Sequence, residues 1–455
     1  MRLRTKAVWS LVAALCLSLL VSAPLAAQTV TTGNISGAVT DAQGGVLPGA
    51  VVTATHTDTG TSYEAVTGGD GHFSILNVRV GTYTIAANMS GFKEHKIEKA
   101  VVQLGADFVA DFKLPLATLS ETVDVVAGTP IVDTSRAGTA SNVSQAVIDS
   151  LPTISRSVYD FARTSPHFNV GATSATDDTS VSVAGRNNRY NNMQIDGAVS
   201  NDVFGLSTSG TPGGQTGTQP ISLDAIQEIQ LVVSSYDVRQ GGFTGGGVNA
   251  ITKSGSNALH GTAYYFGRSQ SLIGKIPGIT TVANPNPADT KVGSFSDKQG
   301  GFTLGGPIAK SKAFFFGNYD MGRKNTPSGF SADGSSSVQW GTQSNVQQVI
   351  DIAKSKYGYD PGGLGEYSRP NNNDKFFVRT DFNLSPRHQL TYRLNYVDGT
   401  ANIGSISSTA YLLSDRFYSI QDKNLSNVWQ LNSTLGKGFN AVSYTHLTLP
   451  TILRV

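Results

Sequence analysis

The sequence predicts a mainly β protein, and three observations support this fold class. Short segments of alternating apolar and polar residues recur between Gly, Pro, Asn and Asp turn signals, as expected for β-strands. Charged residues make up 15% of the 455 residues and glycine accounts for 50 of them, which is typical of all-β envelope proteins. In the second half, connections between expected strands are alternately long and short, as in transmembrane β-barrels.

The first 27 residues predict export. Arg2, Arg4 and Lys6 precede an apolar stretch over residues 7–21, and small residues follow up to Ala27, which is the order of a signal peptide. We expect cleavage after Ala27, with Ala23 as the alternative site. The apolar stretch is shorter than the roughly 20 residues needed to cross a bilayer, so we do not interpret it as an anchor.

Composition excludes several classes of function. The only cysteine, Cys16, lies in the leader, so the mature chain has no disulfide, zinc–cysteine site or cysteine nucleophile. The seven histidines are scattered without a second ligand at metal spacing, and we expect no metal and no cofactor. A net charge of +2 without a clustered basic face argues against nucleic acid as a partner.

Residues 29–116 form the first predicted unit. Seven β-prone segments separated by turn signals every 8 to 12 residues predict a small β-sandwich. The segments are residues 34–40, 50–56, 62–67, 72–78, 81–89, 95–102 and 106–114. The motifs at residues 37–41, 47–51, 70–73, 81–83 and 91–92 resemble the carboxypeptidase-regulatory-like (transthyretin-like) domain, and we expect Phe73, Tyr83 and Phe92 to pack in its core.

The stretch from residue 181 to residue 255 organises the rest of the chain. GRNNRYNNMQIDG at residues 185–197 is followed by SLDAIQEIQLV at residues 222–232 and by GGGVNAITKSGSNALHG at residues 245–261. The three pieces in this order resemble the plug of TonB-dependent outer-membrane receptors, and within that family the Oar-like branch with a regulatory-like domain ahead of the plug. We call residues 131–253 the plug, and expect an α+β fold with short helices at residues 143–149 and 159–162.

Within the plug, two turns carry the residues that we transfer from the resemblance. These residues are Gly185, Arg186, Asp196 and Gly197. The resemblance implies that the Arg and the Asp pair with opposite charges on a barrel wall and hold the plug closed without a permanent lock. A salt bridge inside the plug is the alternative, and the sequence does not separate the two.

The linker at residues 117–130 carries an isolated β-prone segment without a neighbouring hairpin partner. Such a segment can add to the sheet edge of another protein. By position it resembles a TonB box, although Asp124 interrupts its apolar run, and the alternative is the last sandwich strand or the first plug strand. The expected box comprises Glu121, Thr122, Val123, Asp124, Val125 and Val126.

Residues 258–442 predict the first strands of an antiparallel transmembrane β-barrel. Expected strands cover residues 259–268, 299–306, 313–321, 375–384, 388–397 and 424–435, with a fragment from residue 439. Because about seven strands cannot enclose a plug, we expect this barrel to be incomplete and the chain to be truncated. Residues 443–455 break the alternation and resemble translated adapter DNA, so we expect this tail to be non-native.

The aromatic side chains of these strands are expected to form girdles at the membrane interfaces. They are Tyr264, Tyr265, Phe266, Phe314, Phe315, Phe316, Tyr319, Tyr392 and Tyr396. In the segment from Phe377 to Leu384, alternation places Phe377 and Arg379 on one face together with Asp381 and Asn383.

The resemblance implies a TonB-dependent receptor that takes a large or scarce ligand into the periplasm and is not an enzyme. Its implied partners are TonB, outer-membrane lipid and an extracellular ligand such as an oligosaccharide, a peptide or a metal chelate. A surface adhesion or protein- and carbohydrate-binding protein without transport is the alternative. A hydrolase is a third hypothesis, for which the sequence offers no nucleophile, metal or acid pair.

Overall fold

The computed structural model describes most of the chain from residue 31 to residue 454. The described residues are 31–117, 125–126, 138–153, 156–173, 179–235, 244–275, 294–327, 330–334, 338–339, 341–385, 387–404, 413–434 and 440–454. The expected signal peptide and the first four residues of the expected TonB box lie outside them. Among the described residues, no helix is long and apolar enough to cross a bilayer.

The first unit is a β-sandwich, which we call the sandwich. One sheet contains β1 (Gly33–Asp41), β4 (His72–Val78), β7 (Asp107–Val109) and β8 (Phe112–Leu114). The other sheet has the order β3 (Ser62–Val66), β2 (Val51–His56), β5 (Gly81–Asn88), β6 (His95–Val102) and β9 (Val125–Val126). The expected strands are confirmed, except that residues 106–114 are divided between β7 and β8.

The sandwich core lies between these two sheets, because alternate side chains of each strand point inward. Phe73 and Tyr83 are buried in it, and Phe92 packs at its margin, as the sequence predicts.

The plug is built on a five-stranded sheet. The strand order is β10 (Gly138–Val143), β15 (Ile226–Ser235), β16 (Gly247–Thr252), β13 (Asn192–Ile195) and β14 (Ala198–Val199). A separate hairpin pairs β11 (Phe168–Thr173) with β12 (Thr179–Val183), and the helices α2 (Gln145–Ser150) and α3 (Val158–Ala162) confirm the expected helical stretches. Ser157 caps α3 in a capping box with Asp160, which explains why that helix begins there.

One plug turn requires positive φ, and one close approach in the plug leaves no room for a side chain. Asp196 and Gly197 both have positive φ, of 49° and 81°, in the tight turn that joins β13 to β14. This is the hairpin geometry that an Asp-Gly pair favours. A Cβ on Gly246 would lie 2.5 Å from the nearest methyl carbon of Val183, so the glycine lets β16 pass directly under β12.

A seven-stranded antiparallel sheet, which we call the wall, curves over the plug. Its strands pair in sequence order, and β17 and β25 form its two open edges. They are β17 (His260–Ser269), β18 (Ser296–Ala309), β19 (Ala313–Pro327), β22 (Ser368–Ser385), β23 (His388–Ile403), β24 (Tyr418–Thr434) and β25 (Asn440–Arg454). All seven strands were expected, but five of the first six extend several residues beyond the predicted ends.

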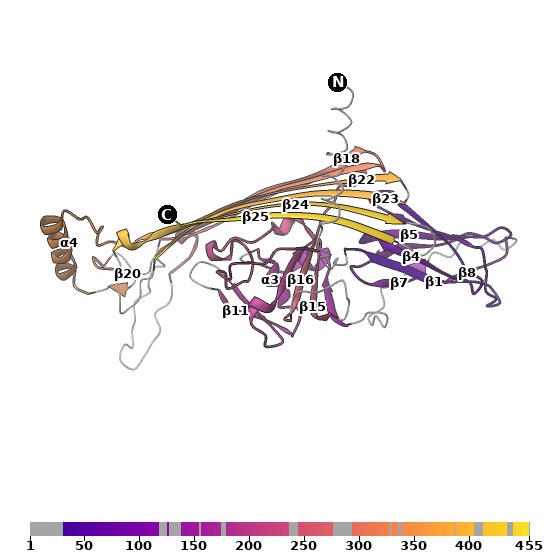
Figure 1. Ribbon diagram of the computed structural model, residues 1–455, viewed down its shortest axis with the longest axis horizontal. Coiled ribbons are helices and arrows are strands. Elements are labelled where there is room, and N and C mark those ends of the chain that lie inside the picture. The colour runs from indigo at the N-terminus through magenta and orange to yellow at the C-terminus, as the bar shows by residue number, and fades with distance from the viewer. Residues whose placement is uncertain are drawn as a thin grey trace, which may run out of the picture.

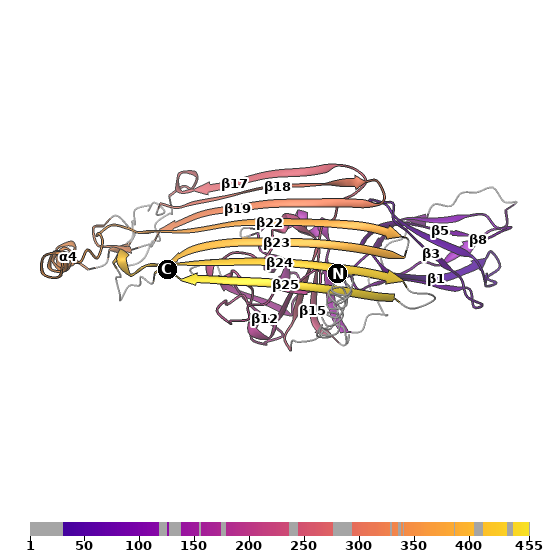
Figure 2. The same ribbon diagram turned by 45° about the horizontal axis from the view of Figure 1, so that its top comes forward.

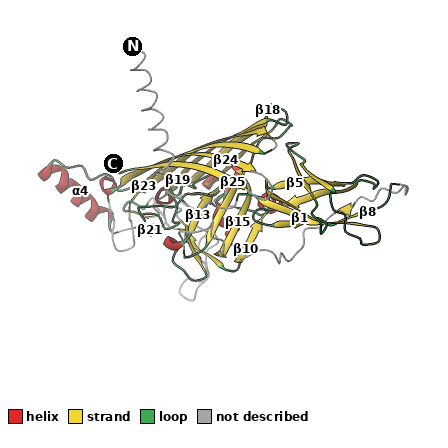
Figure 3. Ribbon diagram, turned by 45° about the vertical axis from the view of Figure 1, so that its right-hand side comes forward, coloured by secondary structure: helices red, strands yellow, loops and turns green. Residues whose placement is uncertain are grey.

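Figures 1 and 2 show the wall as a long curved sheet with the plug beneath its concave face. The sandwich lies at one end of the wall, and α4 (Gln343–Tyr357) lies at the opposite end. Figure 3 shows that strands dominate all three units and that helices are few and short apart from α4. The short turns after β18 and β22 lie at the sandwich end, because Ser311 and Asn383 there contact each other and Asn383 contacts the sandwich.

The expectation that all nine aromatic side chains form interface girdles is wrong for three of them. Phe314 and Phe316 are buried, and Phe316 packs against Phe377 and into the plug core. Tyr264 also turns inward, where its hydroxyl donates to Asp320. Alternation along β19 explains the error: every second residue faces the plug, and a run of three consecutive phenylalanines cannot occupy one face.

Two further segments extend beyond the expected elements. The connection between β19 and β22 contains β20 (Phe330–Ser331), β21 (Val338–Gln339) and the helix α4, which the sequence analysis did not predict. β25 includes most of the residues that we set aside as a non-native tail, and its backbone pairs with β24 from Asn440 to Arg454.

Candidate functional site

A buried cluster of charges joins the plug to the wall, and Asp196 is its plug member. One carboxylate oxygen of Asp196 lies 2.9 Å from a guanidinium nitrogen of Arg393 on β23. The other lies 3.8 Å from Arg379 on β22. The hydroxyl and the backbone N–H of Thr252 donate to the two carboxylate oxygens at 2.6 and 2.9 Å. The tight turn at Asp196 and Gly197 therefore presents this side chain to two wall arginines.

Arg379 connects Asp196 to a second acid on its own strand. Its guanidinium donates two hydrogen bonds to Asp381, at 2.9 and 3.0 Å, and two more to the backbone and hydroxyl oxygens of Thr252. Arg393 donates in addition to Gln430 on β24 at 2.8 Å. We call Asp196, Arg379, Asp381 and Arg393 the ionic cluster.

Burial and neighbouring cations act in opposite directions on Asp196. Burial disfavours its carboxylate, but the guanidinium groups of Arg393 and Arg379 and the hydrogen bonds from Thr252 outweigh burial and lower the pKa of Asp196. The carboxylate is therefore ionised at neutral pH and pairs with both arginines. A buried ion pair of this kind holds two surfaces in register and contributes less to stability than its distances suggest, because desolvation opposes the attraction.

The other residues transferred from the resemblance lie elsewhere. Gly185 and Arg186 are exposed at the turn after β12, and Arg186 forms no ion pair among the described residues. Gly197 donates its N–H to the side chain of Asn249 inside the plug. Of the expected TonB box, only the backbone of Val125 and Val126 is described, where β9 pairs in parallel with β6 at Ile97 and Glu98.

The wall partners Arg379 and Arg393 were not identified as site residues from the sequence. Alternation did place Arg379 and Asp381 on one face of β22 with Phe377, and all three side chains are buried. The sequence did carry a signal for Arg379, which is the pair of opposite charges that it forms with Asp381 two residues later on the same expected barrel strand. Because a charged side chain facing lipid is costly, both side chains are expected to point into the barrel.

A second set of polar contacts joins plug and wall nearer the long-loop end. Ser222 of the plug donates to Asp320 on β19 at 3.1 Å, and Lys375 on β22 pairs with the same carboxylate at 2.9 Å. Asn395 on β23 donates to the backbone oxygen of Pro220 at 2.8 Å. These polar contacts lie beside the apolar contact that Phe316 and Phe377 of the wall make with the plug core.

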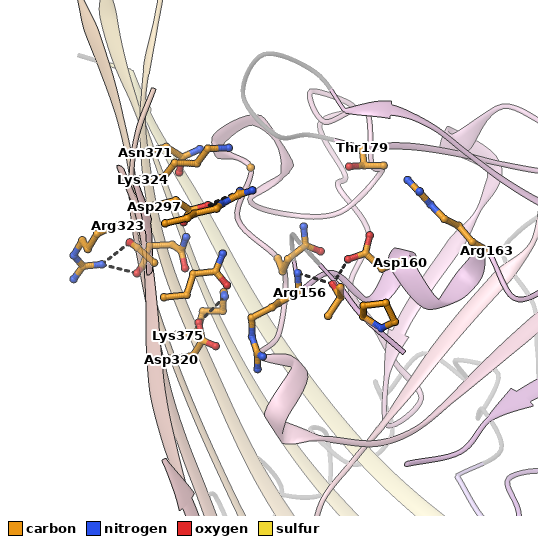
Figure 4. A pocket seen from close by; sticks show the side chains of 18 residues that line it. Arg156, Asp160, Arg163, Thr179, Asp297, Asp320, Arg323, Lys324, Asn371 and Lys375 are labelled. Carbon is orange, nitrogen blue, oxygen red and sulfur yellow. Dashed lines mark hydrogen bonds and ion pairs between the residues drawn. The ribbon is translucent and has the colours of Figure 1, made fainter. Parts of the chain in front are cut away.

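A cavity of about 420 Å³ lies between the plug and strands β17, β18, β19 and β22. Figure 4 shows Arg156, Asp160 and Arg163 on the plug side, facing Lys324, Asn371 and Lys375 across the space. Its lining contains more basic than acidic side chains, and several are already paired, as Arg268 is with Asp297 at 2.7 Å. The basic members are Arg156, Arg163, Arg268, Arg323, Lys324 and Lys375, and the acidic members are Asp160, Asp297 and Asp320.

Aromatic rings support one side of this cavity. The guanidinium of Arg156 lies 4.2 Å from the ring centre of Tyr264 and 5.5 Å from that of Phe266, and it also pairs with Asp224 of the plug. These contacts fix Arg156 in a cation–π arrangement between plug and wall. Within the described part of the chain, no group of three or more His, Cys, Asp or Glu side chains could hold a metal ion.

Three family comparisons match consecutive parts of the chain. The carboxypeptidase regulatory-like domain matches residues 34–115, the TonB-dependent receptor plug domain matches residues 132–248, and an outer membrane beta barrel domain matches residues 251–348. The TonB-dependent transporter Oar of Myxococcus xanthus is 28% identical over 299 residues, which cover 63% of this chain. The matched region spans only 26% of the length of that relative.

Solved structures similar to this chain are outer-membrane transporters and receptors. The outer membrane transporter YddB from Escherichia coli has a TM-score of 0.45 at 14% identity and covers 65% of this chain and 37% of its own. The ferric enterobactin receptor PfeA from Pseudomonas aeruginosa has a TM-score of 0.44 at 15% identity and covers 69% of this chain and 41% of its own. The three matched domains and their order show that the chain belongs to the TonB-dependent outer-membrane receptor family, with a carboxypeptidase regulatory-like domain ahead of its plug.

Proposed function

We propose that the protein takes up a ligand across the outer membrane by TonB-dependent active transport. In this proposal the ligand binds between the plug and the wall from the long-loop side, and TonB pulls on the segment from Glu121 to Val126 to displace the plug. The ionic cluster is the main support for this proposal. It holds the plug against the wall through ion pairs of Asp196 with Arg393 and Arg379, and such non-covalent bonds can break and reform. No covalent chemistry is assigned to the protein.

The cavity lining narrows the ligand class. Basic side chains outnumber acidic ones, and the lining is polar with guanidinium, ammonium and amide donors. Donors of this kind recognise carboxylate, phosphate or hydroxyl oxygens. We therefore propose a polar ligand rich in oxygen acceptors, which includes anionic metal chelates and acidic oligosaccharides or peptides.

The segment at residues 121–126 is the proposed point of force. A β-prone strand can pair with an exposed sheet edge of a partner through its backbone N–H and C=O groups. Proline at position 123 removes one backbone N–H and disfavours strand geometry, whereas alanine keeps the donor. Comparing the two variants therefore separates backbone pairing from side-chain packing.

The experiment measures depletion of solutes from the medium by cells that express the receptor from its own gene. The cells receive a defined panel of ferric siderophores, acidic oligosaccharides and acidic peptides, and mass spectrometry measures how much of each remains in the medium. We expect wild type and Val123→Ala to deplete a panel member and Val123→Pro to match a gene deletion. Unchanged depletion by Val123→Pro, or no depletion beyond the deletion strain, would contradict the proposal.

A further inference from the structure

The sandwich touches both the plug and the wall at the short-turn end of the barrel strands. We propose that it acts as a latch that ties the plug to the wall and must detach before the plug can move. This latch is a separate proposal from ligand uptake. Only the idea that TonB releases the latch rests on the proposed function. Figure 1 shows the sandwich lying across the end of the wall beside the plug sheet.

The plug side of the latch is the loop between β6 and β7, at Leu104. The Leu104 side chain is fully buried in a small apolar cluster with Val80 of the sandwich and Ile251 of the plug. Its backbone N–H donates to Glu228 at 3.3 Å, and its carbonyl accepts from Asn142 at 3.1 Å and from Gln230 at 3.2 Å. A single loop residue is thus held by three polar side chains of β10 and β15.

The wall side of the latch is formed by three polar contacts. Arg79, in the turn between β4 and β5, pairs with Asp381 of β22 at 2.8 Å. Thr61 accepts from Asn383 at 2.9 Å, and the hydroxyl of Tyr63 accepts from Gln389 at 2.9 Å. These contacts lie on β22 and β23, the two strands that carry the arginines of the ionic cluster.

Arg79 connects the latch to the ionic cluster through Asp381. One oxygen of Asp381 accepts from Arg79, from Arg379 and from the hydroxyl of Thr391. Arg79 also donates to Ser254, two residues after the last plug strand, at 3.3 Å. Removing Arg79 therefore takes one of two paired guanidinium groups from Asp381, which keeps Arg379, and breaks the contact with the plug at Ser254.

The chain path places the latch next to the proposed point of force. The strand β9, which contains the end of the expected TonB box, pairs in parallel with the sandwich edge β6. Leu104 follows β6 after one intervening residue. A pulling force on the TonB box would therefore act through β9 on β6, and from β6 on the contact of Leu104 with the plug. Detachment of the sandwich then precedes displacement of the plug.

The test follows exposure of a reporter cysteine between plug and wall. Ser222 is buried and contacts Asp320, so Ser222→Cys reports separation of the two surfaces by its rate of reaction with a polyethylene glycol maleimide. The measurement uses outer-membrane preparations of the whole receptor and needs neither ligand nor TonB. A failure of the latch is therefore distinguishable from a failure of the proposed uptake.

Two variants act on the latch in opposite directions. Arg79→Ala should raise the labelling rate of the reporter at least tenfold. Lys96→Ala is the control: it removes a cation that pairs with Glu94 of the sandwich and should leave the rate unchanged. An oxidised Thr61→Cys/Asn383→Cys pair, which staples the sandwich to the wall, should lower the rate below wild type, and reduction should restore it.

A disulfide inside the sandwich is the matched control for the staple. Thr55 and Ser62 face each other on β2 and β3 with hydroxyls 3.0 Å apart, so Thr55→Cys/Ser62→Cys adds a cross-link without touching the wall. Equal labelling in wild type, Arg79→Ala and the stapled receptor would overturn the latch. The stapled variant keeps the test decisive if Arg79→Ala fails to fold, because it preserves Arg79.

Discussion

Replacing Asp196 with asparagine removes the plug's charge from the ionic cluster at almost constant volume. Asparagine can still accept from the N–H of Thr252, but it cannot neutralise Arg393, which also donates to the neutral side chain of Gln430. Arg379 keeps Asp381 as a partner. The variant therefore leaves one buried guanidinium without an anion.

The magnitude follows from the cost of breaking a buried ion pair by removing one partner, about 3–5 kcal/mol. Because the amide of the new side chain keeps part of the hydrogen bonding, we expect the lower end, about 3 kcal/mol. At 1.4 kcal/mol per factor of ten, the population of displaced plug should rise roughly a hundredfold.

The assay is the labelling rate of the Ser222→Cys reporter, which tracks the open population when opening is fast relative to labelling. Asp149→Asn is the control, since Asp149 is an exposed plug carboxylate on α2. A double-mutant cycle with Arg393→Gln should show that the two losses are not additive. Equal rates in Asp196→Asn and Asp149→Asn, or full additivity in the cycle, would refute the reasoning.

Two predictions concern packing and pH. Phe316→Ala should destabilise the seated plug by about 3–5 kcal/mol because it opens a cavity between the wall and the plug core, whereas Phe315→Ala should cost clearly less; thermal unfolding in detergent compares the two. Burial, followed by the charge of Arg79, lowers the pKa of His56 to about 4, so the folded sandwich excludes a proton that the unfolded chain binds. The free energy of unfolding of the sandwich should therefore be highest above pH 6.5 and fall by about 3 kcal/mol towards pH 4. Hydrogen exchange of β2 and β5 amides measures this loss, and His56→Gln should remove it.

The strands were predictable because each has a local sequence signal, namely alternating apolar and polar residues between turn residues. β4 and β6 begin and end at the predicted residues, since turn residues bound both and one face of each packs in the sandwich core. The Asp196–Gly197 turn was predictable for the same reason, because both residues tolerate positive φ. Alternation also separated the buried face of β22 from its outer face.

Contacts between residues far apart in the sequence have no such local signal and could not be predicted. Arg379 and Arg393 meet Asp196 only because β22 and β23 pass over the plug hairpin, a placement that depends on the whole curvature of the wall. The contact of Arg79 with Asp381 joins residues 302 positions apart. The girdle prediction was wrong for Phe314 and Phe316 because consecutive rings on one strand point to opposite faces of the sheet.

A disulfide between plug and wall tests most directly whether the plug must leave the wall for uptake. Ser222 and Asp320 are in hydrogen-bond contact at 3.1 Å, so Ser222→Cys/Asp320→Cys should cross-link the two surfaces. Depletion of the solute panel should stop in oxidised cells and resume after reduction, while each single cysteine variant continues to take up solute. Continued depletion with the cross-link fully formed would contradict the account.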